Sequence, residues 1–167
     1  MIVLGVDPGT QVTGYGVIRG DNGSSATLIE CGVIRTVSTD PLPDRLREIH
    51  EGIAELIQRH SPDVMSIEDV FYARNVRTTV VLGHARGVIL LAAAQRNMRV
   101  HEMTPKEIKK AVTGAGGASK EQVQFMVTKL LRLKSAPKPS DAADGVAAAL
   151  GYLMGAHLQE AVRRAAQ

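Results

Sequence analysis

The sequence has few aromatic residues, one cysteine and no long apolar segment. Tryptophan is absent, and two phenylalanines and three tyrosines are the only aromatic side chains besides histidine among 167 residues. Cys31 has no second cysteine with which to form an internal disulfide, and no Cys/His cluster indicates zinc. The longest uninterrupted apolar run, residues 87–94, is far shorter than the roughly 20 residues that span a bilayer. These features argue against a disulfide-stabilised secreted scaffold and against a membrane protein.

The N-terminal sequence predicts a cytoplasmic location. It begins directly with the strand-like run 2–6, without a basic leader, which predicts that no export signal is cleaved. A hydrophobic fraction of 44% and a charged fraction of 22% are typical of a globular chain. We expect a single domain over residues 1–157, with 158–167 as the end of a C-terminal helix and tail.

The charge is unevenly distributed along the chain. The total is +3, but residues 96–138 contain ten basic and three acidic side chains, a net charge of +7. Such a segment favours either a surface for a polyanion or a set of solvated helix faces, and the pattern alone does not choose between them.

The hydrophobic periodicity predicts an α/β fold. Apolar and β-branched runs predict strands over 1–6, 13–19, 26–36, 64–67 and 99–102. Asp21-Asn22-Gly23 predicts a hairpin turn. Helical spacing and capping residues predict helices over 42–60, 76–95, from Thr104 onward, 119–133 and 140–166. The strand–helix–strand crossover at 42–67 predicts a parallel pair, so we expect one mixed five-stranded sheet flanked by helices.

Acidic residues occur where two of these strands end and where the last helix begins. Asp7 and Glu68 each follow a strand, and parallel neighbours would place them at one sheet edge. Asp141 and Asp144 are spaced to share one helix face. Each acid alone has a plainer interpretation as a turn, surface or helix-dipole residue. Four acids together would repel one another without cations, and oxygen ligands alone suit Mg²⁺ or Mn²⁺. A pair of such ions is typical of phosphodiester cleavage.

Six motifs in order resemble the RuvC family of Holliday-junction resolvases. They are Asp7-Pro8-Gly9 and residues 13–16, 67–71, 83–87, 119–123 and 141–144. The resemblance, which covers about residues 1–157, implies a ribonuclease-H-like fold and divalent metal held by Asp7, Glu68, Asp141 and Asp144. Some relatives have histidine at the position of Asp141, so the ligation there stays open.

The resemblance also implies a specific activity. It implies a homodimeric endonuclease that resolves four-way DNA junctions by paired symmetric nicks during recombination and repair, leaving 5′-phosphate and 3′-hydroxyl ends. The expected cofactor is Mg²⁺, with Mn²⁺ as an alternative and two ions per site. The RuvA–RuvB branch-migration complex is the expected partner, in the nucleoid-associated cytoplasm of a bacterium. The apolar helix 76–94 is the best candidate for the dimer contact, or else packs within the protomer.

The residues expected to contact DNA fall into two groups. The resemblance implies that Phe71 stacks on an unpaired base and that Arg74 contacts the strand at the crossover, within a segment that also contains Tyr72 and Asn75; a core position for one ring is the alternative. Two basic residues, Lys109 and Lys120, match family positions near the scissile phosphate, and Lys120 would neutralise developing charge there. Solvated helix faces are the alternative for both lysines.

Two other functions fit parts of the sequence. Asp7-x-Gly9 resembles the phosphate loop of actin-like sugar kinases and ATPases, but those enzymes usually need two such domains. A junction-binding protein that has lost catalysis would keep the basic segment, yet the presence of all four acids argues against it. Metal-dependent nicking of a four-way junction distinguishes the three.

Overall fold

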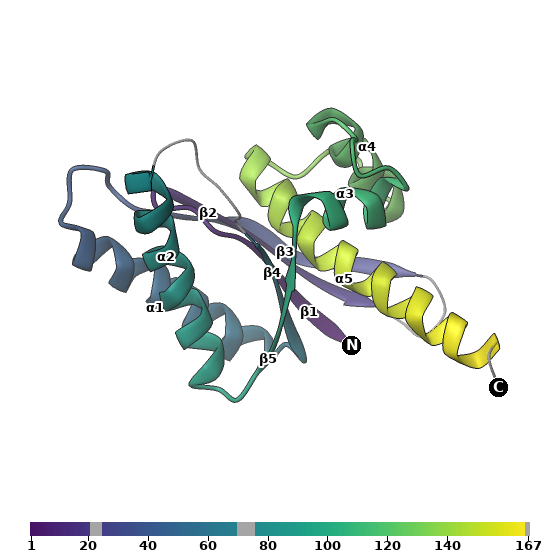
Figure 1. The fold of residues 1–167 in the computed structure, drawn as a ribbon, viewed down its shortest axis with the longest axis horizontal. Helices are drawn as coiled ribbons and strands as arrows, with labels where there is room; N and C mark the ends of the chain where they lie inside the picture. The colour runs from purple at the N-terminus through teal and green to yellow at the C-terminus, as the bar shows by residue number, and fades with distance from the viewer. Residues whose placement is uncertain (21–24, 70–75, 166–167) are drawn as a thin grey trace.

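A computed structural model describes residues 1–20, 25–69 and 76–165. They form a central sheet with helices on both faces (Figure 1). The strands are β1 (Ile2–Asp7), β2 (Val12–Gly20), β3 (Ala26–Arg35), β4 (Val64–Glu68) and β5 (Arg99–Met103). The helices are α1 (Leu42–His60), α2 (Val76–Ala94), α3 (Pro105–Thr113), α4 (Lys120–Leu130) and α5 (Ser140–Ala165). The predicted α/β class and the number of strands are confirmed.

The strand order is β3-β2-β1-β4-β5, with both kinds of pairing. β1, β2 and β3 pair antiparallel, whereas β4 pairs parallel with β1 and with β5. The mixed sheet and the parallel crossover are therefore as predicted. The expected turn Asp21-Asn22-Gly23 lies outside the described residues, between two strands that are antiparallel.

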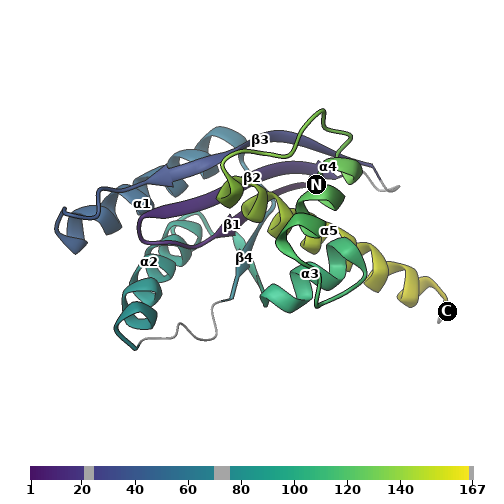
Figure 2. The same ribbon diagram turned by 90° about the horizontal axis from the view of Figure 1, so that it is seen from above.

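The side-chain alternation of the strands divides the core into two layers. Val3 of β1 and Val64 of β4 pack with α3, α4 and α5, whereas Leu4 and Met65 pack with α1 and α2. Figure 2 shows the same arrangement from above, with the C-terminal end of α5 extending past the strands. Because alternate residues face opposite layers, the orientation of each residue near a strand end follows from its position.

Two predicted N-terminal caps are confirmed, but the C-terminal end of α4 differs from the prediction. Thr104 and Ser119 cap α3 and α4, each with a reciprocal capping box. α4 ends at Leu130, three residues before the predicted end. Arg132 has a left-handed backbone (φ 52°), and the Leu133 N–H donates to the Thr128 carbonyl oxygen at 2.9 Å. This turn closes the helix early, although the apolar pattern continues.

The start of α5 lies directly against β2. Ala142 and Ala143 are fully buried, and a Cβ on Gly14 would lie only 1.9 Å from the Asp141 carbonyl oxygen. Small residues on both elements thus allow the helix to approach the sheet at the end that carries Asp141 and Asp144.

We expect Gly14→Ala to destabilise the protein and to impair the acidic end of α5. The added methyl group has to displace backbone, which costs about 1–3 kcal/mol or more of unfolding free energy. Urea denaturation measures the loss. Gly155→Ala is the matched control, because no described atom beyond the adjoining helix backbone lies within 4 Å of its Cβ position in α5; there alanine should stabilise the helix by up to about 1 kcal/mol. Equal stability of the two variants would contradict the close approach.

Candidate active site

The ends of β1 and β4 place two carboxylates side by side. Val6 pairs with Ile67 across the parallel strands, so Asp7 and Glu68 follow at the same sheet edge. By alternation both side chains belong to the face covered by α5, since Ser66, two residues before Glu68, donates its hydroxyl hydrogen to the Ala148 carbonyl oxygen of that helix. The predicted proximity of these two acids is confirmed.

These carboxylates line a pocket between the sheet edge and three helices. It has a volume of about 270 Å³. Three acids and two lysines provide its charged groups: Asp7, Glu68, Asp144, Lys109 and Lys120. The fourth predicted acid, Asp141, does not line this pocket, and its Oδ2 accepts a long hydrogen bond of 3.4 Å from Ser140. Its negative charge still acts on Asp7.

Burial and the proximity of several acids change the protonation of the site. Burial, followed by the charges of Glu68, Asp144 and Asp141, raises the pKa of Asp7 from 3.8 to about 8. Burial and the charge of Asp144 also raise the pKa of Glu68, against the opposing effect of Lys109 and Lys120. Near neutral pH the Asp7 carboxyl therefore keeps a proton that an exposed aspartate would have lost.

Lys120 forms an ion pair with one acid of this cluster. The capping box of Ser119 fixes the start of α4, and from its first turn the Lys120 Nζ reaches Asp144 Oδ2 at 2.6 Å. Its hydrogen bond to Asp144 raises the pKa of Lys120, so the side chain remains charged. Because half of its surface is exposed, the ammonium group is also accessible to an anion that enters the pocket.

The donor set fits a hard divalent cation. Among the described residues that line the pocket, the side-chain groups able to bind a cation are carboxylates, without histidine or cysteine, and carboxylate oxygens are the ligands that such a cation prefers. Within the described ranges, no three His, Cys, Asp or Glu side chains converge closely enough to form a complete metal-ion group. The carboxylates thus surround the pocket without converging on a single point within it.

Two further groups of residues bear on the site. The predicted DNA contacts Phe71, Tyr72, Arg74 and Asn75 lie outside the described residues. In contrast, sequence reasoning gave no role to Arg86, which pairs with Asp69 directly after Glu68. The acid next to Glu68 and the arginine in the 83–87 motif were visible in the sequence, but their contact depends on how α2 packs.

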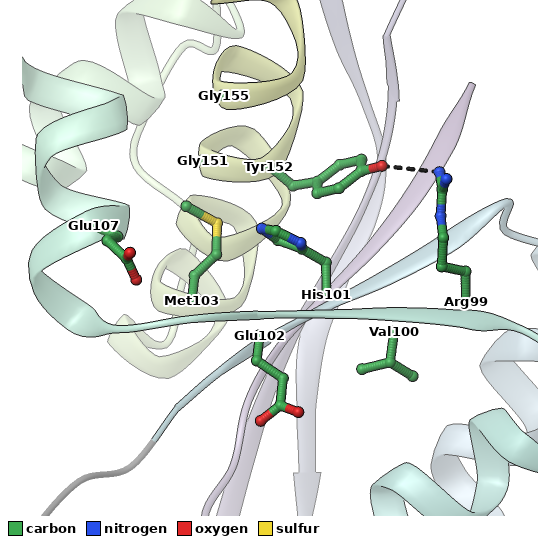
Figure 3. Close-up of a pocket in the computed structure, with 9 residues that line it drawn as sticks. All are labelled: Arg99, Val100, His101, Glu102, Met103, Glu107, Gly151, Tyr152 and Gly155. Carbon is green, nitrogen blue, oxygen red and sulfur yellow. Dashed lines mark hydrogen bonds between the residues drawn. The ribbon is translucent and has the colours of Figure 1, made fainter. Parts of the chain in front are cut away.

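A second pocket, of about 450 Å³, lies between β5 and α5 (Figure 3). Arg99 donates a hydrogen bond of 2.9 Å to the Tyr152 hydroxyl, and the His101 ring meets the Tyr152 ring edge-on at 5.1 Å. Glu102 and Glu107 add opposite charge to its lining. It shares no residue with the acidic pocket.

Comparisons with known proteins agree with this geometry. The family model for crossover junction endodeoxyribonuclease RuvC matches residues 3–152. The enzyme of that name from Parafrankia sp. (strain EAN1pec) is 50% identical over 153 residues, which is 92% of this chain and 86% of the relative. The Thermus thermophilus RuvC structure superposes with a TM-score of 0.87 at 34% identity, covering 95% of this chain and 97% of that one. T. thermophilus RuvC in complex with Holliday junction substrate gives the same TM-score at 32% identity, covering 95% and 96%.

The mixed sheet with acids at the edge shared by β1 and β4 defines a nuclease of the ribonuclease-H-like class. The family model and the relatives match almost the whole chain, which identifies the family within this class. The chain belongs to the RuvC family of crossover junction endodeoxyribonucleases. Membership of this nuclease family also decides against the kinase-like alternative.

Proposed function

We propose that this enzyme resolves four-way DNA junctions in recombination and repair by paired symmetric nicks, leaving 5′-phosphate and 3′-hydroxyl ends. The observation that carries the proposal is the pocket in which Asp7, Glu68 and Asp144 face Lys120 and Lys109. Acids suited to cations beside lysines suited to a phosphate match the chemistry of phosphodiester hydrolysis. The solved complex of a 32% identical relative with Holliday junction substrate supports the choice of DNA.

Asp7, Glu68, Asp144 and Asp141 would hold Mg²⁺, or Mn²⁺, as two ions per site. Bound there, the metal would supply an activated water and stabilise the leaving 3′ oxygen. Because its pKa is raised, Asp7 holds a proton near neutral pH, and it would lose this proton to become a metal ligand. Asp141 would have to turn toward the pocket from the first turn of α5, which makes it the most replaceable of the four.

The lysines would bind and orient the phosphate. Lys120 would leave Asp144 in part and place its ammonium group against charge that develops on the phosphate during cleavage. Lys109, which lines the same pocket from α3, would contact the DNA backbone. Of the remaining predicted contacts, we propose that Phe71 stacks on an unpaired base, with Tyr72, Arg74 and Asn75 on the DNA beside it.

Nicking of a synthetic four-way junction tests the proposal. In Mg²⁺ the enzyme should cut two symmetry-related strands and leave a linear duplex of the same sequence intact, and ligation should reseal the products because the ends are 5′-phosphate and 3′-hydroxyl. Binding without nicking in either Mg²⁺ or Mn²⁺ would favour the non-catalytic junction binder. Equal cutting of the duplex would refute structure selectivity.

We propose that α2 forms the contact of a homodimer. Its exposed stripe follows helical spacing through Val76, Val80, Gly83, Gly87 and Leu91, whereas its opposite side packs against α1. Val76, Val80 and Leu91 expose 80%, 53% and 50% of their surface. Apart from the adjoining backbone of α2, no described atom lies within 4 Å of a Cβ on either glycine, which would allow a second helix to approach closely.

Arg86 argues against a membrane as the environment of this apolar stripe. Among the described helices, α2 alone has the length and mean hydropathy, 1.3 over its most apolar window, to cross a membrane. However, it carries Arg86, which is paired with Asp69 and Glu102 of the same protomer. We therefore place the enzyme in the bacterial cytoplasm at the nucleoid, where the RuvA–RuvB complex would be its partner.

We expect the double variant Val80→Glu/Leu91→Glu to be monomeric and to lose paired nicking. Four carboxylates would be brought together in the dimer contact, so its dissociation constant should rise by at least about a hundredfold. Sedimentation analysis measures the mass, and cleavage of a cruciform plasmid distinguishes one nick from two. Val37→Glu is the control, since Val37 is 56% exposed outside α2. A dimeric double variant would place the contact elsewhere.

A further inference from the structure

Arg86 lies, with most of its side chain covered, on the side of the sheet opposite to the acidic pocket. Strand alternation turns Glu68 toward α5 and the next residue, Asp69, toward α2. The same alternation applies to β5, where Met103 points toward α5 and Glu102 points the opposite way (Figure 3). Two carboxylates therefore meet α2 at the ends of adjacent strands.

Arg86 joins these two carboxylates. Its Nη2 lies 3.4 Å from Asp69 Oδ1 and in direct hydrogen-bond contact with Glu102 Oε2. The arginine side chain is only 13% exposed, compared with 28% for Asp69 and 55% for Glu102. Removal of a cation buried to this extent would leave the half-buried Asp69 carboxylate without its partner, which costs more than breaking a surface ion pair.

The backbone at this point connects the ion pairs to Glu68. The Asp69 N–H donates to the Met103 carbonyl oxygen at 2.7 Å, and Glu68 pairs with Met103 in the parallel ladder. Asp69 follows and Glu102 precedes a member of the last residue pair of the β4–β5 ladder, Glu68 and Met103. Arg86 bridges the Asp69 and Glu102 side chains and so connects the strand ends that orient Glu68.

We propose that Arg86 is a positioning residue for Glu68. It holds the ends of β4 and β5 together from the α2 face, so that the Glu68 carboxylate stays directed into the acidic pocket. This inference rests on the proposed function, in which Glu68 is a metal ligand. Arg86 would then affect catalysis although it does not line the acidic pocket.

Arg86→Met tests the proposal, because methionine keeps the apolar stem and removes the cation. We expect junction cleavage to slow by about ten- to a hundredfold, with kcat affected and the junction dissociation constant in EDTA unchanged within about twofold. Direct Mn²⁺ titration, followed by electron paramagnetic resonance, should show binding weakened by about tenfold. The matched control is Arg47→Met, which breaks an exposed ion pair to Asp44 on α1 and should behave as wild type.

A triple variant separates positioning from simple charge balance. Arg86→Met/Asp69→Asn/Glu102→Gln leaves no charge to neutralise, so its melting temperature should recover even if Arg86→Met alone folds poorly. Positioning predicts that cleavage and Mn²⁺ affinity stay low in this variant. Recovery of both with the melting temperature, or wild-type behaviour of Arg86→Met, would overturn the proposal. Failure of the wild type to nick the junction would instead refute the proposed function, and the Mn²⁺ titration would still report on Arg86.

Discussion

Asp7→Asn should abolish junction cleavage and yet make the metal-free protein more stable at neutral pH. The carboxylate faces Glu68 and Asp144 around one pocket, and the amide keeps its shape without its charge. Loss of a proposed metal ligand should lower the cleavage rate by at least about a hundredfold. Junction binding should persist or tighten, because the lysines remain and one negative charge near the phosphates is gone.

The gain in stability has a defined pH dependence. The pKa of Asp7 is raised from 3.8 to about 8, so between these pH values the folded wild type holds a proton that the unfolded chain has lost. The contribution of Asp7 to the free energy of unfolding of the wild type is greatest below pH about 4. It declines, by up to about 1.4 kcal/mol per pH unit, as the pH rises to about 8. The amide of the variant does not titrate, so the advantage of Asp7→Asn should grow across that window.

Thermal melting in EDTA from pH 4 to pH 9 measures this difference. Asp44→Asn is the matched control, since Asp44 is an exposed acid with a surface partner on α1 and should show neither effect. Melting curves of wild type and Asp7→Asn that stay parallel at every pH would contradict the raised pKa. Cleavage by Asp7→Asn at the wild-type rate would remove Asp7 from the proposed site.

Local patterns predicted the elements and the positions of the strand-end acids well. The apolar runs and helical stripes located all ten elements of the described residues, Thr104 was recognisable as a cap from the acid three positions later, and Ser119 also proved to be a cap. The proximity of Asp7 and Glu68 followed from one parallel pairing. Each of these features depends on a short stretch of chain or on a single topological step.

Features that depend on helix packing were harder to predict. The end of α4 is set by the backbone of Arg132, whereas the apolar pattern runs on to Leu133. The spacing of Asp141 and Asp144 predicts one helix face, but only Asp144 reaches the pocket. The ion pairs of Arg86 join three elements, and their distances follow from the placement of α2 against the sheet.

Lys120→Met should impair the chemical step more than it impairs DNA binding. Lys120 is the cation paired with Asp144 at 2.6 Å and lies in the pocket where the phosphate would enter. Removing one group that stabilises charge in a transition state typically lowers kcat by about 10²–10³-fold. Loss of one phosphate contact should reduce the log–log salt dependence of binding by only about one unit.

Lys129→Met is the matched control for Lys120→Met. Both lysines belong to α4, but Lys129 lies over the Phe125 ring, 5.4 Å from its centroid, and does not line the acidic pocket. Single-turnover cleavage at saturating enzyme, together with binding at several salt concentrations, separates the two steps. If the variants lose cleavage equally, then the lysines of α4 act only through long-range attraction of DNA. If Lys120→Met alone loses kcat while both keep most of their affinity, then Lys120 acts at the phosphate, because the two substitutions remove the same charge from the same helix and differ only in position.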